Sequence, residues 1–425
     1  MFKFKQITLE NGLNILLVPS SETLSVRALV LVKAGSLYES KDINGISHFM
    51  EHMCFKGTKK RPTSIEINKE IDEIGGRLNA FTSQEYTGYW AWVDKDHYDL
   101  ALDVISDIYL NSIYPHPEME KEKGVVIEEL NMYHDDPKTY VWDLWSDVLY
   151  GDQPAGWEIG GTKKTIRQIT RNKLLVYRQK FYHSHSTLVV ISGNFSENKI
   201  KNLVRKNFKL VPKKSPRAQY VTIEKQNKPR VLLKYRETDQ THLILGWRAF
   251  DYFSPQRYAL ALLNAILDGG MSGILFQLVR EQLGAAYYII TDVDLFKDHG
   301  YWAVATGLNH QKVKQVIPLI LKEFYHLLDK HLTEKNLKKA KQYLIGSISL
   351  TLDNVHNYAR DLAFDLLLKN EIETPEQYIK KIKTISLNDL KKTAQEIIKP
   401  NRLNLALVGP FKDKRVFEKL IKQVI

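Results

Sequence analysis

Hydrophobic and polar positions follow two periods along the chain, which predicts a mixture of strands and helices. Residues 25–34 are rich in Val and Leu and predict a strand that ends at Gly35. Residues 77–93 combine aromatic residues with Thr and predict further β-structure. Asn11-Gly12 lies between two apolar stretches and predicts a hairpin near the N-terminus. The chain therefore alternates strands with helical segments.

Helical periodicity predicts a series of amphipathic helices between and after these strands. One begins at the capping-box pair Thr63 and Glu66 and ends at Gly75-Gly76. The others are expected near residues 96–111, 118–134, 138–150, 164–181 and 254–267.

The second half of the chain repeats a pattern of the first. Residues 186–208 and 402–424 each predict a strand followed by a helix, and each strand ends in a Gly-x-Phe sequence. Two copies indicate a duplicated domain rather than a solenoid. We expect an α+β fold: two homologous α/β-sandwich domains, each a mostly antiparallel sheet packed with helices.

A stretch with two prolines and clustered charges divides the two copies. The predicted organisation is an N-terminal domain at 1–208 that carries the histidine motif described below, a linker at 209–217 and a homologous C-terminal domain at 218–425. The second copy has no equivalent of the histidine motif described below, so we expect it to lack a metal site.

Composition narrows the class of protein further. The 425 residues are 44% hydrophobic, yet no run of about 18 apolar residues predicts a membrane span. The N-terminus does not resemble a signal peptide. The single cysteine, Cys54, fits a reducing compartment, and we expect the cytoplasm. The helical angle of Cys54 predicts a buried structural thiol.

The formal charge of +12 raises the alternative of a nucleic-acid partner. The lysines are spread along amphipathic helices, as in residues 333–345, and no nucleic-acid motif accompanies them. Solvated helix faces account for this charge. We expect no nucleic-acid partner.

The most informative stretch is residues 44–58, which contains His48, Glu51 and His52 in the order His-x-x-Glu-His. Histidines four apart lie on one helix face and can bind one metal ion. The remaining side chains of this helix are apolar, so the pair is expected in an interior, where unpartnered polar groups are costly. A zinc ion with His48 and His52 as ligands and Glu51 as general base satisfies the pattern. Two hydrogen-bonded core histidines are the alternative.

A second helix, at about 118–134, offers the acidic ligand. Glu122 and Glu129 lie near one another on a face with Val125, Val126 and Tyr133. Glu129 is predicted as the third metal ligand and Glu122 as an acid that orients a ligand or water. Glu128 lies towards the edge of this face. In the alternative interpretation, both carboxylates line a surface groove.

Residues 267–289 form the most distinctive stretch of the second half. Gly269-Gly270 predicts a turn, and the following helix carries Arg280 and ends near Gly284. Arg280 and Tyr287 could donate hydrogen bonds to a peptide carbonyl or a developing oxyanion. An ordinary surface arginine and strand tyrosine would have the same pattern.

The chain resembles the pitrilysin/insulinase family of inverted-zincin metallopeptidases, and most closely its two-domain branch related to the mitochondrial processing peptidase. Four segments carry the resemblance: GISHFMEHMCFKGT, EIGGRLNAFTSQEYTGYW, EKEKGVVIEEL and LDGGMSGILFQLVREQLGAAY. They occur in the family's order and span most of the chain. The resemblance selects Glu129 over Glu128 and pairs Glu122 with the site.

The resemblance also implies how substrate is held. Asn79 and Ala80 would lie on an edge strand to which an extended peptide adds by main-chain pairing. Arg280 and Tyr287 would approach the substrate across a chamber. Because four homologous domains enclose such a chamber, a chain with two implies a dimer, either of identical chains or with a homologous subunit. Arg280 and Tyr287 would then act on the zinc site of the other subunit.

The sequence thus predicts a zinc-dependent endopeptidase that hydrolyses unfolded or short peptides inside a dimeric chamber. The first alternative is a non-catalytic chamber subunit that binds peptides and pairs with an active partner. Intact His48, Glu51, His52 and Glu129 argue against it. The second alternative, a basic nucleic-acid-binding protein, predicts affinity that falls steeply with salt.

Overall fold

A computed structural model describes residues 2–423. Residues 1, 424 and 425, which include the last position of the predicted repeat at 402–424, lie outside the described residues. Contacts group the chain into two compact units of three segments each. The first unit comprises residues 1–130, 158–220 and 350–373, and the second comprises 131–157, 221–349 and 374–425.

The first unit is built on a six-stranded sheet of order β1-β2-β6-β3-β5-β4. Its strands are β1 (Lys5–Thr8), β2 (Asn14–Pro19), β3 (Ser25–Val32), β4 (Arg77–Thr82), β5 (Thr87–Asp94) and β6 (Thr187–Gly193). β2 and β6 are parallel, and the other neighbours are antiparallel. Every residue of β6 is buried, because this strand has neighbours on both sides and helices over the sheet.

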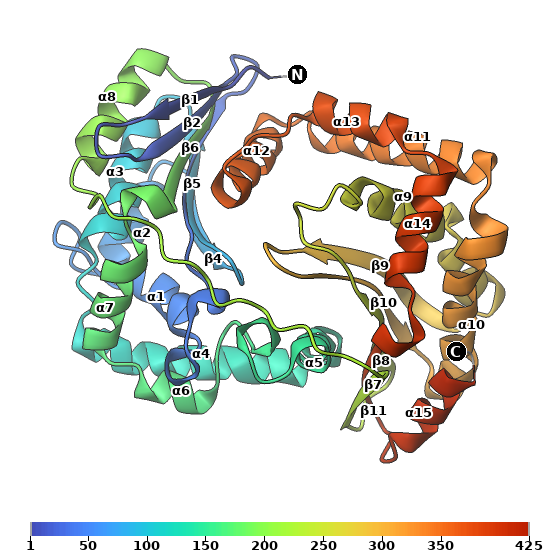
Figure 1. Ribbon diagram of the computed structural model, residues 1–425. Helices are drawn as coiled ribbons and strands as arrows, with labels where there is room; N and C mark the ends of the chain where they lie inside the picture. Colours follow the sequence, from blue (N-terminus) through green and yellow to red (C-terminus); the bar gives the residue numbers. More distant parts are fainter. Residues whose placement is uncertain (1, 424–425) are drawn as a thin grey trace. The chain divides into compact units, whose positions relative to one another are not determined.

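Helices cover both faces of this sheet (Figure 1). α3 packs on β3 and β5, while α12 lies on the opposite face against β2, β3 and β6. The helices of the unit are α1 (Ile46–Cys54), α2 (Ser64–Asp72), α3 (Tyr98–Asn111), α4 (His116–Asp135, through Leu130), α6 (Lys163–Gln168), α7 (Arg171–Phe181), α8 (Glu197–Phe208) and α12 (Val355–Lys369).

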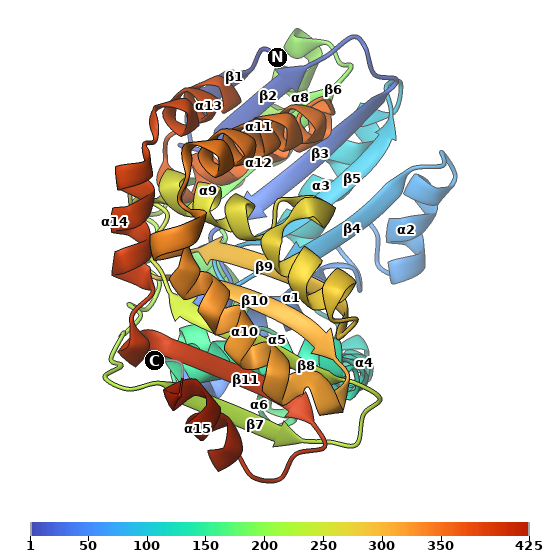
Figure 2. The same ribbon diagram turned by 90° about the vertical axis from the view of Figure 1, so that its right-hand side faces the viewer.

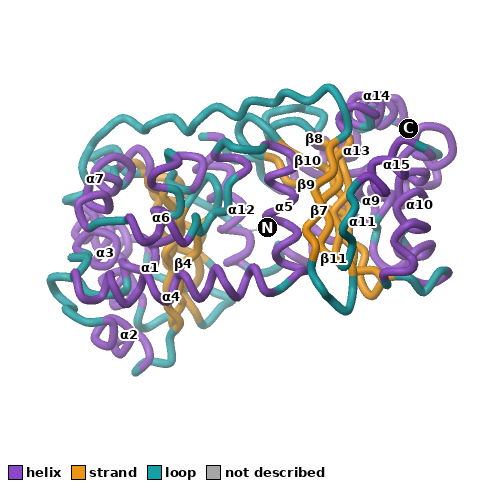
Figure 3. The backbone as a smooth tube through the Cα atoms, turned by 90° about the horizontal axis from the view of Figure 1, so that it is seen from below, coloured by secondary structure: helices purple, strands orange, loops and turns teal. Residues whose placement is uncertain are grey.

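The second unit has a five-stranded sheet of order β7-β11-β8-β10-β9, which Figure 2 shows strand beside strand. The strands are β7 (Arg230–Tyr235), β8 (Thr241–Arg248), β9 (Ala286–Leu295), β10 (Gly300–Leu308) and β11 (Leu403–Gly409). The helices are α5 (Pro137–Tyr150), α9 (Arg257–Leu267), α10 (Val313–His326), α11 (Glu334–Thr351, through Ser349), α13 (Pro375–Thr384), α14 (Leu387–Ile397) and α15 (Arg415–Lys422). In each unit the strands run between helices (Figure 3).

The two sheets share one topology, which confirms the duplicated α+β domains. In both, the first strand of the motif pairs in parallel with the last strand, β2 with β6 and β7 with β11. The last strand then pairs antiparallel with the second, and the order continues to an edge strand, β4 or β9. β1 is an addition to the first sheet.

Each unit includes one helix that comes from the other half of the sequence. α5 lies in the first half of the chain but packs on β7, β8 and β11 of the second unit. α12 lies in the second half but packs on the sheet of the first unit. The domains proposed at 1–208 and 218–425 therefore describe the repeat along the chain, whereas the compact units exchange these segments.

Most predicted elements occur where the pattern placed them. The hairpin at Asn11-Gly12 joins β1 to β2, and the Thr63–Glu66 capping box begins α2. The helix predicted at 164–181 is interrupted: Ile169 ends α6, and the Thr170 side chain caps α7. Within residues 2–423, the helices are all too short or too polar to cross a membrane.

Candidate metal centre

A buried carboxylate begins the helix that carries the histidine motif. Glu39 accepts hydrogen bonds from the backbone N–H groups of Gly45 and Ser47 at 2.7 and 2.8 Å, and from the side chain of Asn44 at 3.2 Å. The backbone N–H groups of Gly45 and Ser47 are among those that the start of a helix leaves without intrahelical partners. Burial raises the pKa of Glu39, although the hydrogen bonds oppose this shift. Glu39 therefore fixes where α1 starts, a contact that no pattern in the sequence indicated.

A close loop covers the same end of α1. Gly45 has φ of +91°, and a Cβ there would lie 2.5 Å from the Gly160 carbonyl oxygen. A Cβ on Gly160 would in turn lie 3.7 Å from the Nδ1 of His48. The same Cβ on Gly160 would lie only 2.7 Å from the Leu130 side chain, whereas 3.7 Å to His48 is an ordinary contact. The two glycines therefore let this loop pack closely on α1 and on Leu130.

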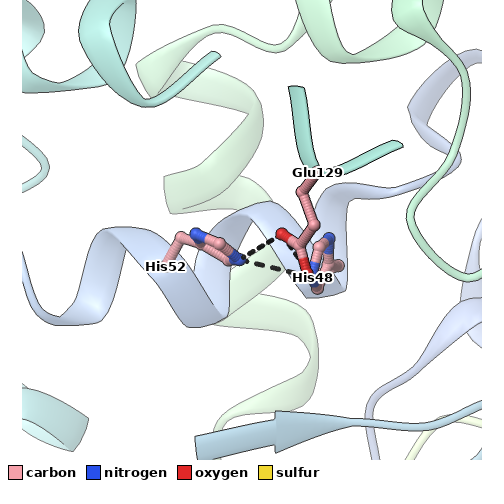
Figure 4. Close-up of side chains that lie close together, drawn as sticks. All are labelled: His48, His52 and Glu129. Carbon is pink, nitrogen blue, oxygen red and sulfur yellow. Dashed lines mark hydrogen bonds and ion pairs between the residues drawn. The ribbon is translucent and has the colours of Figure 1, made fainter. Parts of the chain in front are cut away.

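Three predicted ligands meet between α1 and α4 (Figure 4). The Nε2 atoms of His48 and His52 are 3.2 Å apart. The Oε2 atom of Glu129 lies 3.3 Å from His52 Nε2 and 3.7 Å from His48 Nε2. The sequence separation between Glu129 and His52 is bridged because α4 lies beside α1 in the first unit. The structure thus brings together the residues that the motif and the helical spacing selected.

These atoms fit a zinc ion by spacing and by type. Tetrahedral zinc with bonds of about 2.0–2.1 Å places its ligand atoms about 3.3 Å apart, close to the three separations observed. Two imidazole nitrogens and a carboxylate oxygen are a donor set that zinc accepts, with a fourth position left for water. The Nδ1 of His48 is buried without a hydrogen-bond partner among the described residues.

The charge state of the two histidines differs strongly. Burial, together with the neighbouring His52, lowers the pKa of His48 to about 4, so its ring is neutral. Burial also acts to lower the pKa of His52, but hydrogen bonds to Glu122 and Glu129 outweigh it and raise the pKa to about 9. With its pKa above neutrality, His52 holds a proton that offsets part of the acidic charge of Glu122 and Glu129.

Glu122 lies directly behind His52. Its Oε1 atom is 2.9 Å from His52 Nδ1, and its Oε2 atom is 2.6 Å from the Lys56 ammonium. Burial would raise the pKa of Glu122, yet the contacts with His52 and Lys56 lower it overall. A carboxylate on Nδ1 orients the ring so that Nε2 faces the cluster. Lys56 was not predicted, although it follows His52 by one helical turn.

Glu51 points to a neighbouring strand. Its carboxylate accepts a hydrogen bond from the Thr82 hydroxyl of β4. Burial raises the pKa of Glu51, against the lowering effects of Thr82 and His52. A raised pKa makes a carboxylate a stronger base, which suits it to accept a proton. Thr82 was also missed; its position two residues after Ala80, on one side of the strand, is the only signal in the sequence.

The face of α4 differs in part from the predicted stripe. The buried residues are Met119, Glu122, Val126 and Leu130. Glu129 is half-buried and Glu128 is exposed. The predicted stripe members Val125 and Tyr133 are exposed as well, as is Met132. The buried stripe is centred towards Met119 and Leu130, which turns Val125 outwards, and Tyr133 lies beyond the part of α4 that belongs to the first unit.

Asn79 and Ala80 lie on β4, an edge strand of the first sheet. Both pair with β5 on the inner side, opposite Trp90 and Tyr89. The N–H of Ala80 donates to the Asn79 side chain at 2.8 Å. That N–H belongs to the strand's outer edge, where an added strand would otherwise be its acceptor.

Arg280 and Tyr287 lie together on the second unit. The Arg280 guanidinium is 5.8 Å from the centre of the Tyr287 ring and 4.9 Å from that of Phe276. Arg280 lies on a π-helical turn, residues 276–282, and Tyr287 on the edge strand β9. Both side chains are exposed, Tyr287 to 76%. Neither belongs to the ligand cluster, all of which lies in the first unit.

Cys54 is buried, as predicted, and its thiol donates to the Tyr89 hydroxyl at 3.6 Å.

The duplicated fold and the inverted histidine motif define a class, the two-domain metallopeptidases of the inverted-zincin type. Two family profiles match the chain: "Insulinase (Peptidase family M16)" over residues 15–163 and "Peptidase M16 inactive domain" over residues 168–344. The chain belongs to the insulinase family, peptidase family M16.

Relatives of similar length carry the name zinc protease. The zinc protease YmxG of Bacillus subtilis is 33% identical over 96% of this chain and 98% of its own. A zinc protease of Streptomyces coelicolor is 32% identical over 97% of this chain and 90% of its own. These names support zinc at the level of the family.

Solved structures match the fold. A protease from Helicobacter pylori has a TM-score of 0.87 at 22% identity and covers 96% of this chain and all of its own (100%). A peptidase M16 inactive domain from Pseudomonas fluorescens has the same TM-score, 0.87, at 17% identity, covering 96% and 99%. At these identities the likeness concerns the fold alone.

Proposed function

We propose that the protein is a zinc-dependent endopeptidase that hydrolyses unfolded or short peptides. The observation that carries this proposal is the spacing of His48, His52 and Glu129, whose donor atoms lie 3.2–3.7 Å apart. Zinc bound there would polarise the scissile carbonyl and acidify water.

The residues around the ligands have distinct tasks. Glu51 takes the proton of the attacking water and passes it to the leaving amine. Thr82 holds the Glu51 carboxylate from β4. Glu122 keeps the Nε2 atom of His52 directed at the ligand cluster, and Lys56 offsets the charge of Glu122.

Substrate would add to the open edge of β4. An extended peptide can pair its main chain with this edge at Asn79 and Ala80, replacing the Ala80 hydrogen bond to the Asn79 side chain. Main-chain pairing requires an extended segment, so unfolded or short peptides are favoured over folded proteins. Arg280 and Tyr287 supply donors for a peptide carbonyl.

The family resemblance adds the assembly. A chain with two homologous domains would form half of a four-domain chamber, so we propose a dimer of identical chains or with a homologous subunit. Arg280 and Tyr287 would then serve the partner's site.

Cleavage of a quenched oligopeptide by the purified chain tests this function. We expect turnover that a chelator abolishes and zinc restores. Glu51→Gln should lower kcat by about 10²–10⁴-fold while zinc stays bound, because the general base is lost and the ligands remain. His116→Ala, at an exposed position at the start of α4, is the matched control and should leave kcat unchanged.

A non-catalytic peptide-binding subunit gives a different result. It would bind the same oligopeptide without cleaving it, with or without zinc, and Glu51→Gln would change nothing. That outcome would replace the peptidase proposal with the binding-subunit alternative.

A further inference from the structure

A second group of two histidines and one glutamate lies in the second unit. Glu323, His326 and His331 place one donor atom each within 4.8 Å of one another. All three come from α10 and the turn that follows it. The group is unrelated to α1 and to the histidine motif.

The contacts centre on the carboxylate of Glu323. Its Oε2 atom lies 2.7 Å from His331 Nε2, and its Oε1 atom lies 3.4 Å from His326 Nδ1. The side chains are 9%, 17% and 20% exposed for Glu323, His326 and His331. The group is therefore largely shielded, although each side chain keeps some contact with solvent.

The backbone brings these side chains together by a local irregularity. Glu323 and His326 are three apart and share a face of α10. On a straight α-helix His331 would lie about 12 Å beyond Glu323 along the axis, because eight residues separate them and each adds about 1.5 Å. Residues 327–331 instead form a π-helical turn, a local irregularity frequent at functional sites.

The end of this turn is held in place. The carbonyl of His331 accepts hydrogen bonds from the Asn336 side chain at 2.9 Å and from the Thr333 N–H at 3.0 Å. Phe324 of α10 and Leu327 at the start of the turn are fully buried in the core of the unit. The ring of His331 is therefore presented to Glu323 by a fixed backbone.

The charge of Glu323 calls for a cation. Among residues 2–423, its ion-pair partners are the two imidazoles. A carboxylate as shielded as that of Glu323 is disfavoured unless its charge is offset. A divalent cation between the three donors would supply that charge.

We propose that Glu323, His326 and His331 form a second metal site, for zinc or a similar late first-row divalent cation. Two imidazoles favour such ions over magnesium and calcium, which prefer oxygen ligands. Three protein ligands leave further positions for water. The metal would tie the π-helical turn to α10. This site is independent of the proposed peptidase activity.

The expectation that the second half lacks a metal site came from the absence of a second His-x-x-Glu-His. That absence applies to the position equivalent to α1, which is α9. The new group uses different residues on a different helix, so the missing motif has no bearing on it.

Zinc stoichiometry of the full chain tests the proposal. The purified protein is stripped with chelator, loaded with zinc alone, passed over a desalting column and analysed for metal. We expect two zinc ions per chain in the wild type. His331→Gln and His326→Gln should each lose one zinc and keep the wild-type kcat on the quenched peptide. His116→Ala should keep both ions.

The double variant His48→Ala, His52→Ala separates this site from the proposed catalytic one. It should retain one zinc, and zinc should raise its thermal midpoint because the metal binds the folded chain alone. Adding His331→Gln to that variant should abolish both the zinc and the shift. If the double variant retains no zinc and shows no shift, or if His331→Gln and His326→Gln both keep the wild-type stoichiometry, the second site is refuted.

Discussion

The two units share one sheet topology but differ in the helix that follows the second strand of the shared motif. In the first unit this helix is α1, which presents His48 and His52 to Glu129. In the second unit it is α9, whose sequence RYALALLNAIL is mostly buried apolar side chains. The same frame therefore carries a candidate metal centre in one copy and a packed core in the other. A fold by itself does not determine function, which depends on the side chains placed on it.

The polar residues of the two helices make the same point. Asn264 of α9 accepts a hydrogen bond from the Trp302 indole at 2.8 Å, a contact within the core of the second unit. His52 of α1 faces Glu122 and Glu129 instead. The two copies therefore share their strands but differ in the side chains that α1 and α9 carry.

The strongest test of this comparison concerns how the two helices begin. Glu39→Ala should lower the free energy of unfolding by about 2–4 kcal/mol, because buried N–H groups at the start of α1 lose their acceptor. Denaturant unfolding measures this. In the second unit, α9 begins after Gln256 with no side-chain cap.

Asp251→Ala is the matched control there. Asp251 accepts from the N–H groups of Phe253 and Ser254 ahead of α9, and its loss should cost at most about 1 kcal/mol, as for an ordinary cap. Equal losses for the two variants would show that Glu39 has no special role in α1.

The next prediction concerns the residue behind His52. Glu122→Gln should weaken zinc affinity about 10–100-fold, because an amide orients the His52 ring less strongly than a carboxylate and leaves Lys56 without its counter-charge. Competition with a chromogenic chelator measures the affinity. Glu128→Gln, at an exposed position of the same helix, is the control and should leave the affinity unchanged. Unchanged affinity in Glu122→Gln would remove Glu122 from the metal centre.

Local patterns predicted much of this molecule. Strand and helix periods, the Asn11-Gly12 turn and the repeated Gly-x-Phe strands indicated a duplicated α+β fold, which the two sheets confirm. His48 and His52 meet because positions four apart share a helix face, and this requires no knowledge of tertiary structure.

Contacts between distant segments could not be predicted in the same way. Glu39 caps α1 from the turn before it, and the Thr82 hydroxyl of β4 donates a hydrogen bond to Glu51 of α1. α5 and α12 each pack on the sheet formed mainly by the other half of the chain. These contacts depend on how elements pack, and no periodicity within one segment encodes them. The group of Glu323, His326 and His331 was missed for a related reason. A π-helical turn breaks the regular spacing on which a prediction from α-helical periodicity depends.

The smallest expected effect concerns the two exchanged helices, whose anchors differ in chemistry. His356 of α12 contacts Ser192 Oγ at 2.8 Å and Ser25 Oγ at 3.1 Å. At the end of α5, Arg230 and Arg248 donate to main-chain carbonyls, and a guanidinium keeps its charge at any pH of interest. A change in pH should therefore affect α12 and spare α5.

Burial, with the charge of Arg27, lowers the pKa of His356 from 6.5 to about 4 in the folded protein. Between these values the unfolded chain binds more protons, so this contribution to stability is present above pH 6.5 and is lost as the pH falls towards 4. Hydrogen exchange, corrected for intrinsic rates, should show α12 losing protection between pH 7 and pH 5 while α5 does not. His356→Gln should remove the difference between the two helices. If the variant keeps it, another group anchors α12.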